Sequence, residues 1–260
     1  MNRIIKLFQR KQKGILNIYC TAGYPDLEST RTILHRLELA GADMVEIGMP
    51  YSDPLADGPT IQKSSTVALK NGMTVKKLLT QLEGMRPEIQ MPVILMGYLN
   101  PVMQYGLDAF FSKCKEVGVD GLILPDMPLY EYSKVFLPLF VRYDLKPIFL
   151  VTPQTSTKRI YAIDKLNDAF IYVVSSASTT GKKTGFDDKT IAYFKKIQAM
   201  ELKNPTLIGF GISTNEAYQT ACKYSNGAIV GSEFIRMLEK SENPEDIGRF
   251  INNIKGNILP

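Results

Sequence analysis

The chain has 260 residues, of which 45% are hydrophobic and 22% are charged, a composition typical of a globular protein with an ample apolar core. Its formal net charge of +5 comes from 31 basic and 26 acidic residues scattered along the sequence, which argues against a nucleic-acid-binding surface. No run approaches the roughly 18 apolar residues of a membrane span, and residues 1–14 lack the apolar centre of a signal peptide.

The few cysteines and the single histidine exclude several kinds of site. Cys20, Cys114 and Cys222 are widely spaced and have no CxxC pattern, so neither a disulfide framework nor a metal site is expected. Three cysteines without a disulfide pattern fit a protein of the reducing cytoplasm best. His35 lies inside a predicted helix, which leaves little material for a Ser-His-Asp mechanism.

Taken in order, a basic N-terminal helix at residues 1–13 is followed by alternating β-rich and helix-like runs. The predicted strands are residues 15–21, 43–49, 92–98, 119–125, 145–151, 169–174, 205–210 and 227–231. The predicted helices are residues 27–40, 61–71, 75–85, 107–117, 130–143, 158–166, 189–200, 214–223, 234–238 and 244–254. Eight strands each followed by a helix predict an α/β protein whose 260 residues form one domain, a (β/α)8 TIM barrel with an extra N-terminal helix.

The loops that follow the strands form the working face of such a barrel. Residues 49–60 follow the second strand, residues 99–106 are predicted as a loop after the third, and residues 175–187 follow the sixth. The last of these loops is rich in Gly, Ser and Thr, a composition expected of a mobile lid. The same composition also fits a loop without a function.

Glu46 and Asp57 are the candidate catalytic acids. Glu46 interrupts the apolar second strand, where a carboxyl group has to be paired, neutral or functional, and Gly48 on the same face leaves that carboxyl group uncrowded. Asp57 lies in an Ala-Asp-Gly-Pro sequence within loop 49–60, a composition that ordinary turns also use. We expect the pKa of Glu46 to be raised towards neutrality by an apolar pocket, while Asp57 stays ionised.

Glycines at the ends of the last two strands indicate an anion site. The sequences GFGIS at 209–213 and GSEF at 231–234 place glycine where a strand gives way to a helix, so that backbone N–H groups and a helix N-terminus can face a phosphate. Gly211, Gly231 and Ser232 are the expected donors. Glycines that only permit tight turns would give the same pattern.

Seven landmarks together resemble the tryptophan synthase alpha subunit family over nearly the whole chain. They are IYCTAGYPD, VEIGMPYSDPLADGPTIQ, MGYLNPV, LILPDMP, the Thr- and Gly-rich loop, GFGIS and GSEF. The resemblance implies a lyase of tryptophan biosynthesis that cleaves indole-3-glycerol phosphate by a retro-aldol reaction to indole and glyceraldehyde 3-phosphate.

The resemblance also implies roles for individual positions. Glu46 matches the family's catalytic acid and base, and Asp57 matches its second essential carboxylate. The implied substrate-binding residues are Tyr19, Tyr172, Gly181, Phe210, Gly211, Gly231 and Ser232. Tyr19 stands where phenylalanine is usual, and its hydroxyl group needs a partner.

A partner subunit is implied by the same resemblance. It is a pyridoxal-phosphate-dependent beta subunit in an alpha2beta2 complex, which receives indole through a tunnel and is contacted by Pro50, Asp53 and Pro54. The pyridoxal phosphate belongs to that partner, and no cofactor or metal is expected in this chain.

Four other functions remain open at this point. They are a stand-alone lyase that needs no partner, another phosphate-binding barrel enzyme of aromatic amino-acid biosynthesis, a regulatory subunit that has lost catalysis, and a glycosidase with paired carboxylates. Intact Glu46 and Asp57 argue against the regulatory subunit, and the phosphate site argues against the glycosidase.

Overall fold

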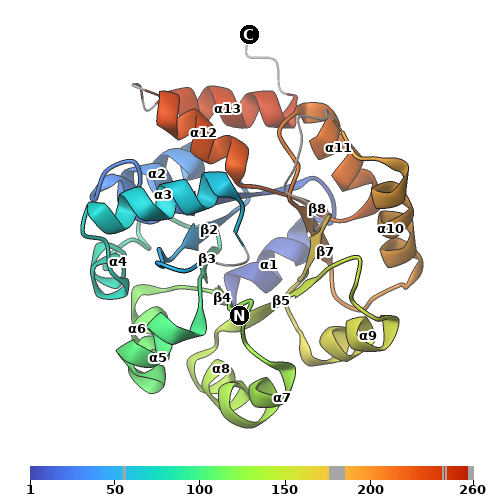
Figure 1. Ribbon diagram of the computed structural model, residues 1–260, viewed down its shortest axis with the longest axis horizontal. Helices are drawn as coiled ribbons and strands as arrows, with labels where there is room; N and C mark the ends of the chain where they lie inside the picture. Colours follow the sequence, from blue (N-terminus) through green and yellow to red (C-terminus); the bar gives the residue numbers. More distant parts are fainter. Residues whose placement is uncertain (55–56, 176–184, 242, 244, 257–260) are drawn as a thin grey trace.

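Eight parallel strands close into a barrel surrounded by helices (Figure 1), as the sequence predicts. The computed structural model describes residues 1–54, 57–175, 185–241, 243 and 245–256. The strands are β1 Ile15–Thr21, β2 Met44–Gly48, β3 Val93–Met96, β4 Gly121–Ile123, β5 Lys146–Val151, β6 Ile171–Val174, β7 Thr206–Gly209 and β8 Gly227–Val230. They pair in sequence order, and β8 returns to β1.

The helices pack against the outside of the barrel, except for α1. They are α1 Arg3–Arg10, α2 Ser29–Leu39, α3 Pro59–Lys70, α4 Val75–Gln81, α5 Leu99–Tyr105, α6 Leu107–Val117, α7 Leu129–Glu131, the π-helical segment η1 Tyr132–Phe136, α8 Leu137–Tyr143, α9 Thr157–Leu166, α10 Asp188–Ala199, α11 Asn215–Tyr224, α12 Ser232–Lys240 and α13 Asp246–Lys255. None of the described helices has the length and hydropathy needed to cross a bilayer.

Two predicted elements differ from the structure. Residues 99–106 were predicted as a loop, but α5 occupies most of them. The prediction of a single helix at 130–143 was wrong in detail, because α7, η1 and α8 follow one another there. Pro138 lacks the backbone N–H that an uninterrupted α-helix would use, and the π-helical segment ends two residues before it.

Alternation along the strands divides the core into two parts. Val45 and Ile47 of β2 face the surrounding helices, whereas Met44 faces into the barrel together with Ile94 of β3 and Ile229 of β8. The interior is therefore packed with side chains, as in other barrels of this size. Polar groups among these side chains have to form hydrogen bonds with their neighbours or serve a function.

Helix α1 closes the N-terminal end of the barrel. Its buried residues Ile4, Leu7 and Phe8 pack with the interior side chains, and Figure 1 shows the helix lying across the ring of strands. The Asn2 side chain fixes the start of α1 by accepting from the Ile4 N–H at 3.0 Å and donating to the Asp120 carbonyl at 2.9 Å. The opposite end, where the strands finish, is the end left for a site.

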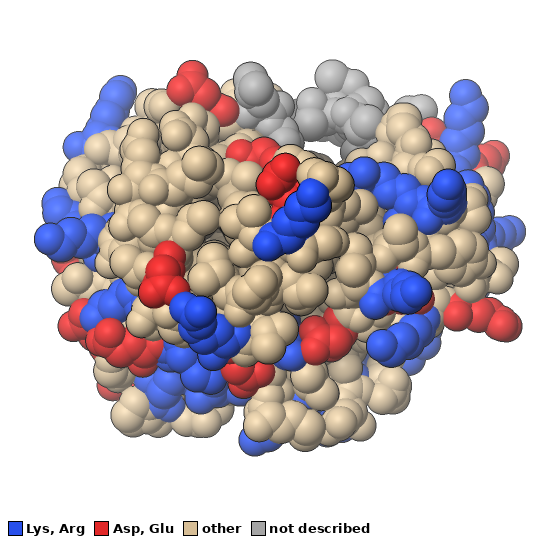
Figure 2. Space-filling model, turned by 90° about the horizontal axis from the view of Figure 1, so that it is seen from below, with Lys and Arg blue, Asp and Glu red and all other residues tan. Residues whose placement is uncertain are grey.

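Figure 2 shows one side of the molecule with acidic and basic side chains interspersed over it. No large area of a single sign of charge stands out on the described part of this side. This pattern agrees with the small net charge of the sequence.

Candidate active site

Glu46 lies on β2 and points into the barrel, where its side chain is fully buried. Asn17 on β1 donates from Nδ2 to Glu46 Oε1 at 2.6 Å. Glu46 Oε2 has no hydrogen-bond partner among the described residues. Burial raises the pKa of Glu46 to about 8, although the Asn17 hydrogen bond acts in the opposite direction. The carboxyl group is therefore mainly protonated at neutral pH and able to give up a proton.

Asp57 lies in the loop between β2 and α3, just before the Gly58 N-cap of that helix. Burial raises the pKa of Asp57 to about 6, and a hydrogen bond with the Tyr98 side chain opposes the rise. This carboxyl group is mainly ionised at neutral pH. The order of the two pKa values matches the division into a protonated acid and a carboxylate that the sequence led us to expect.

A pocket opens beside Asp57 at the carboxyl ends of the first four strands. Its lining is mostly aromatic and apolar: Tyr19, Met49, Tyr51, Asp57, Ser65, Met96, Gly97, Tyr98 and Pro125. The lining combines aromatic rings with one carboxylate, a group that can accept a hydrogen bond from an N–H group. Glu46 is not among the lining residues. Glu46 pairs with Tyr19 in the register of β1 and β2. It lies two residues before Gly48 and is therefore further from the carboxyl end of β2.

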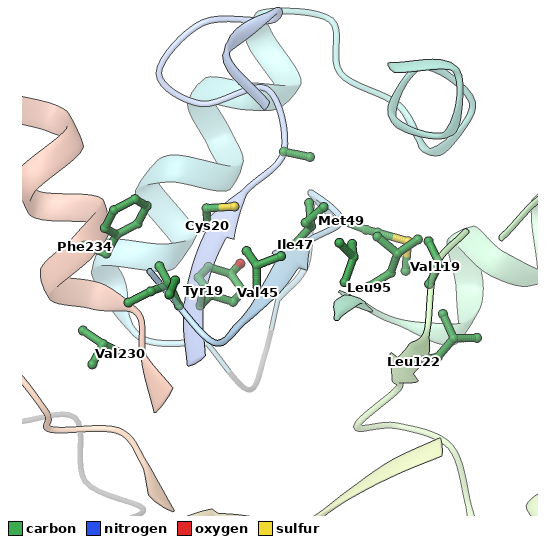
Figure 3. Packing of buried hydrophobic residues seen from close by; sticks show 14 of the residues in the cluster. Tyr19, Cys20, Val45, Ile47, Met49, Leu95, Val119, Leu122, Val230 and Phe234 are labelled. Carbon is green, nitrogen blue, oxygen red and sulfur yellow. The ribbon is translucent and has the colours of Figure 1, made fainter. Parts of the chain in front are cut away.

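Tyr19 and Tyr172 each lie over a glycine of the next strand. A Cβ atom on Gly48 would clash with the Tyr19 hydroxyl group, and one on Gly209 would clash with that of Tyr172. The expectation that Gly48 leaves space for the Glu46 carboxyl group was therefore wrong, because the Tyr19 ring fills that space. Figure 3 shows Tyr19 and Cys20 on β1, with Val45 and Ile47 of β2 beside Tyr19.

The phenol groups of Tyr19 and Tyr172 interact electrostatically with both carboxyl groups. Burial raises the pKa of both Tyr19 and Tyr172, and the charges of Glu46 and Asp57 raise each of them further. The four side chains thus belong to one electrostatic cluster, in which both phenols stay neutral at physiological pH. The Tyr19 hydroxyl group is hydrogen-bonded to Thr21, which supplies the partner that the sequence called for.

The loop after β7 has an unusual backbone conformation. Phe210 and Gly211 have φ values of 69° and 72°, and the Ser175 hydroxyl group donates to the Phe210 carbonyl at 2.8 Å. A bulky residue at positive φ is strained and is typically found at functional positions.

Helix α12 begins at Ser232 with Gly231 as its N-cap, and no described side chain caps it. Helix α11 differs, because the Thr214 side chain accepts from the Ala217 N–H. A Cβ atom on Gly231 would lie 3.4 Å from the Tyr19 Cβ, so the start of α12 adjoins the residue that lines the pocket. An anion at this helix start would lie close to a ring held in the pocket.

Some of the predicted site residues lie away from the pocket or outside the residues that the structure describes. Gly181 and most of loop 175–187 lie outside the described residues. Pro50, Asp53 and Pro54 follow β2, and Asp53 is exposed with its Oδ2 accepting from the Ser52 hydroxyl group at 2.7 Å.

Sequence reasoning missed Asn17, Tyr98 and Ser175. Asn17 carries a signal that could have been used, since it is a polar residue at an inward position of an otherwise apolar strand. Tyr98 and Ser175 depend on contacts between separate loops, and alternation along one strand cannot show such contacts.

Fold and site together define a class of protein: a TIM-barrel enzyme with a buried carboxyl group inside the barrel, a second carboxyl group in an aromatic pocket, and an uncapped helix N-terminus nearby. Residues 5–255 match the family model of the tryptophan synthase alpha chain. The chain belongs to that family.

Individual relatives agree along the whole length. A tryptophan synthase alpha chain of Christiangramia forsetii is 52% identical over 98% of this chain and 99% of its own length. One from Flavobacterium psychrophilum is 51% identical over 98% of this chain and all of its own. The solved structure of tryptophan synthase subunit alpha from Legionella pneumophila has a TM-score of 0.88 at 33% identity, covering 99% of this chain and 98% of that one.

Proposed function

We propose that Glu46 and Asp57 share the chemistry by which this chain cleaves indole-3-glycerol phosphate to indole and glyceraldehyde 3-phosphate. The chain is a lyase of tryptophan biosynthesis, as its family indicates. The observation that carries the proposal is the placement of two carboxyl groups: Glu46 is fully buried inside the barrel, and Asp57 lines the pocket at the carboxyl ends of the strands. Burial raises the pKa of Glu46 to about 8 and that of Asp57 to about 6. An enzyme that has to give and accept protons near neutrality uses groups whose pKa values bracket its working pH.

Glu46 acts as acid and then as base. Carbon–carbon cleavage requires a proton on C3 of the indole, which turns the ring into an electron sink, and the loss of a proton from the side-chain hydroxyl group that becomes the aldehyde. Protonated Glu46 gives its proton to C3. The resulting carboxylate then accepts the hydroxyl proton, so that Glu46 returns to its starting state.

Asp57 stabilises the ring while positive charge develops on it. The charge appears at the indole nitrogen, and an ionised Asp57 in the pocket accepts a hydrogen bond from the indole N–H. The Tyr19 and Tyr98 rings line the same pocket and hold the indole plane. Tyr172 lies over Gly209 on the β7 side of the interior and adds an aromatic wall near Glu46.

The phosphate group binds at the ends of β7 and β8. Phe210, Gly211, Gly231 and Ser232 provide backbone N–H groups, and the uncapped start of α12 adds the positive end of its dipole. The proximity of Gly231 to Tyr19 supports a phosphate attached to the same molecule that fills the pocket. Gly181 and a lid over residues 175–187 belong to the proposal on the strength of the sequence alone.

A beta subunit is the proposed partner, in an alpha2beta2 complex whose pyridoxal phosphate belongs to the beta chain. A solved tryptophan synthase complex from Pyrococcus furiosus matches this chain with a TM-score of 0.86 at 30% identity. Pro50, Asp53 and Pro54 follow β2, and Met103 of α5 and Tyr130 of α7, which are 61% and 66% exposed, follow β3 and β4. Exposed apolar side chains on two neighbouring helices, beside the loop that holds the exposed Asp53, are typical of a protein interface. We place this complex in the cytoplasm, where the free thiols of Cys20 and Cys114 stay reduced.

The Glu46→Gln variant tests the proposed role of Glu46. It keeps the shape and the oxygen that Asn17 contacts, but it cannot exchange a proton. We expect turnover to fall by about 10²- to 10⁴-fold, the usual contribution of a general acid or base, with binding of a phosphate-containing product little changed.

Asp164→Asn is the matched control, because Asp164 is also buried but accepts from the backbone N–H groups of Lys203 and Asn204. It should retain its turnover. If Glu46→Gln retained most of its activity, Glu46 would not be the acid and base.

A further inference from the structure

Asn17 has a side chain that no structural role accounts for. It is fully buried in β1, and its only described hydrogen bond is the donation from Nδ2 to Glu46 Oε1 at 2.6 Å. Its own Oδ1 is buried without a partner among the described residues. Leaving a buried polar atom unpaired costs free energy, so an aliphatic residue at this inward position would be the more stable choice.

The two oxygens of Glu46 have different surroundings because of this contact. Oε1 is held by Asn17, and Oε2 has no partner within the described chain. Oε1 can accept the same hydrogen bond whether the group is a carboxylate or a carboxylic acid, provided that the proton sits on Oε2. The contact therefore need not break when Glu46 changes its protonation state.

We propose that Asn17 is a positioning residue that holds Glu46 by Oε1 through its whole proton cycle and makes Oε2 the single oxygen that exchanges protons with the substrate. This inference rests on the proposed role of Glu46. The balance of the reaction is unchanged: Oε2–H gives its proton to C3 of the indole, and Oε2 then takes the proton of the hydroxyl group whose carbon–carbon bond breaks. Asn17 neither gains nor loses a proton.

Three titratable side chains near Glu46 keep a single protonation state around pH 7. Tyr19 and Cys20 of β1 and Tyr172 of β6 all sense the charge of Glu46, and the pKa of each is raised by burial, to about 12 for Cys20. All three therefore stay neutral. Asp57, which also acts on Tyr19 and Tyr172, is then the other group of this cluster that titrates near neutrality.

The test compares the full chain with Asn17→Leu and Asn17→Ala. We expect both variants to fold, to keep their KM within a few-fold and to lose about 10- to 100-fold in kcat, because the acid is no longer held in its reactive position. The alkaline limb of the rate profile should move to higher pH, because a hydrogen bond that favours the ionised form of Glu46 is gone. Asn17→Ala keeps the test valid if leucine overpacks the site.

A second readout does not depend on activity. NMR titration of the Glu46 carboxyl carbon should show a higher pKa in either Asn17 variant than in the unmodified chain. Asn167→Leu is the control, since Asn167 is also buried but bonds only the backbone of Phe170 and Ala169. It should lower stability and leave the Glu46 titration unchanged.

The experiments on Asn17 and on Glu46 test the two roles separately. A folded Asn17 variant with an unchanged Glu46 pKa overturns the inference, even if its rate falls, because the loss would then come from packing. An unchanged kcat overturns it as well. An active Glu46→Gln variant would instead remove the proposed function, and the NMR titration would still show whether Asn17 holds the carboxyl group.

Discussion

Glu46 is buried and Asp57 is half-buried, and these different surroundings give the two carboxyl groups different pKa values. Glu46 is fully enclosed inside the barrel and has one hydrogen-bond donor, Asn17. Asp57 lines an open pocket and has the Tyr98 hydrogen bond. More complete desolvation keeps the first mainly protonated near pH 7, whereas the second is mainly ionised.

The rate of indole release should depend on pH as a bell. In the proposed mechanism Asp57 is ionised, so we expect activity to rise as pH increases through its pKa of about 6. Glu46 is protonated at the start of the proposed reaction, so we expect activity to fall as pH increases through its pKa of about 8. A profile of kcat/KM from pH 5 to 9 measures both limbs in the free chain. A rate that keeps rising up to pH 9 would show that ionised Glu46 is the starting form.

Part of the site could be predicted at the residue scale. Glu46 stands out because a carboxyl group in an apolar strand has to be paired, neutral or functional, and the glycines after β7 and β8 carry their own backbone signature. The Tyr19 ring over Gly48 and the Tyr98 contact to Asp57 could not be predicted, because they join side chains from different strands and loops. Their formation depends on the closed register of the barrel.

At the scale of elements, β2 serves the site through Gly48 as much as through Glu46. Gly48 is the register partner of Thr21 on β1, and the missing side chain is what admits the Tyr19 ring. The same arrangement recurs on the other side of the barrel, where Gly209 of β7 admits Tyr172 of β6. Each glycine therefore fixes the place of one aromatic wall.

Gly48→Ala should displace Tyr19 from the pocket. The added methyl group would clash with the Tyr19 hydroxyl group and ring, and overpacking of a core costs about 1–3 kcal/mol. We expect a lower free energy of unfolding and a KM for indole-3-glycerol phosphate raised several-fold, measured by denaturant titration and steady-state kinetics.

Gly248→Ala is the matched control, because a Cβ atom there meets nothing within 4 Å. Gly248 lies in α13, so alanine should stabilise the chain by roughly 0.5–1 kcal/mol. An unchanged KM in a folded Gly48→Ala variant would mean that Tyr19 does not shape the substrate pocket.

The element predictions succeeded where periodicity is strong and failed where proline was misread. All eight strands were found, since each is a short β-rich run between turn residues. Helix α5 was missed because Asn100-Pro101 reads as a turn. Pro101 falls in the first turn of α5, where its missing N–H has no partner to lose.

At the scale of the whole molecule, the two ends of the barrel differ in function. Helix α1 closes one end with Ile4, Leu7 and Phe8, and Asp120 there pairs with Arg3 and Arg86. The pocket, the start of α12 and the exposed loop with Asp53 lie at the other end. Stability and chemistry should therefore respond to different substitutions.

Ile4→Ala should destabilise the chain without changing its chemistry. Ile4 is fully buried in the interior cluster, and truncation of a buried isoleucine to alanine costs about 2–5 kcal/mol. Thermal or denaturant unfolding should show this loss, while kcat and KM of the folded fraction stay within twofold. A changed KM would mean that the two ends are coupled.

Asp53→Ala should weaken activation by the beta subunit. Asp53 is exposed and bonds Ser52 of its own loop, so its loss leaves the pocket intact. Titration of beta subunit into the variant should show a weaker increase in indole release, with the rate of the isolated chain unchanged. An equal loss in the isolated chain would assign Asp53 to the chemistry or to the fold instead.

The most direct measurement is the release of indole from indole-3-glycerol phosphate by the purified chain, alone and with a tryptophan synthase beta subunit from the same source. We expect slow release by the chain alone, a strong increase with the beta subunit, and glyceraldehyde 3-phosphate formed in equal amount. Fast release that the beta subunit leaves unchanged would contradict the proposed partnership. No indole in either case would contradict the proposed reaction itself.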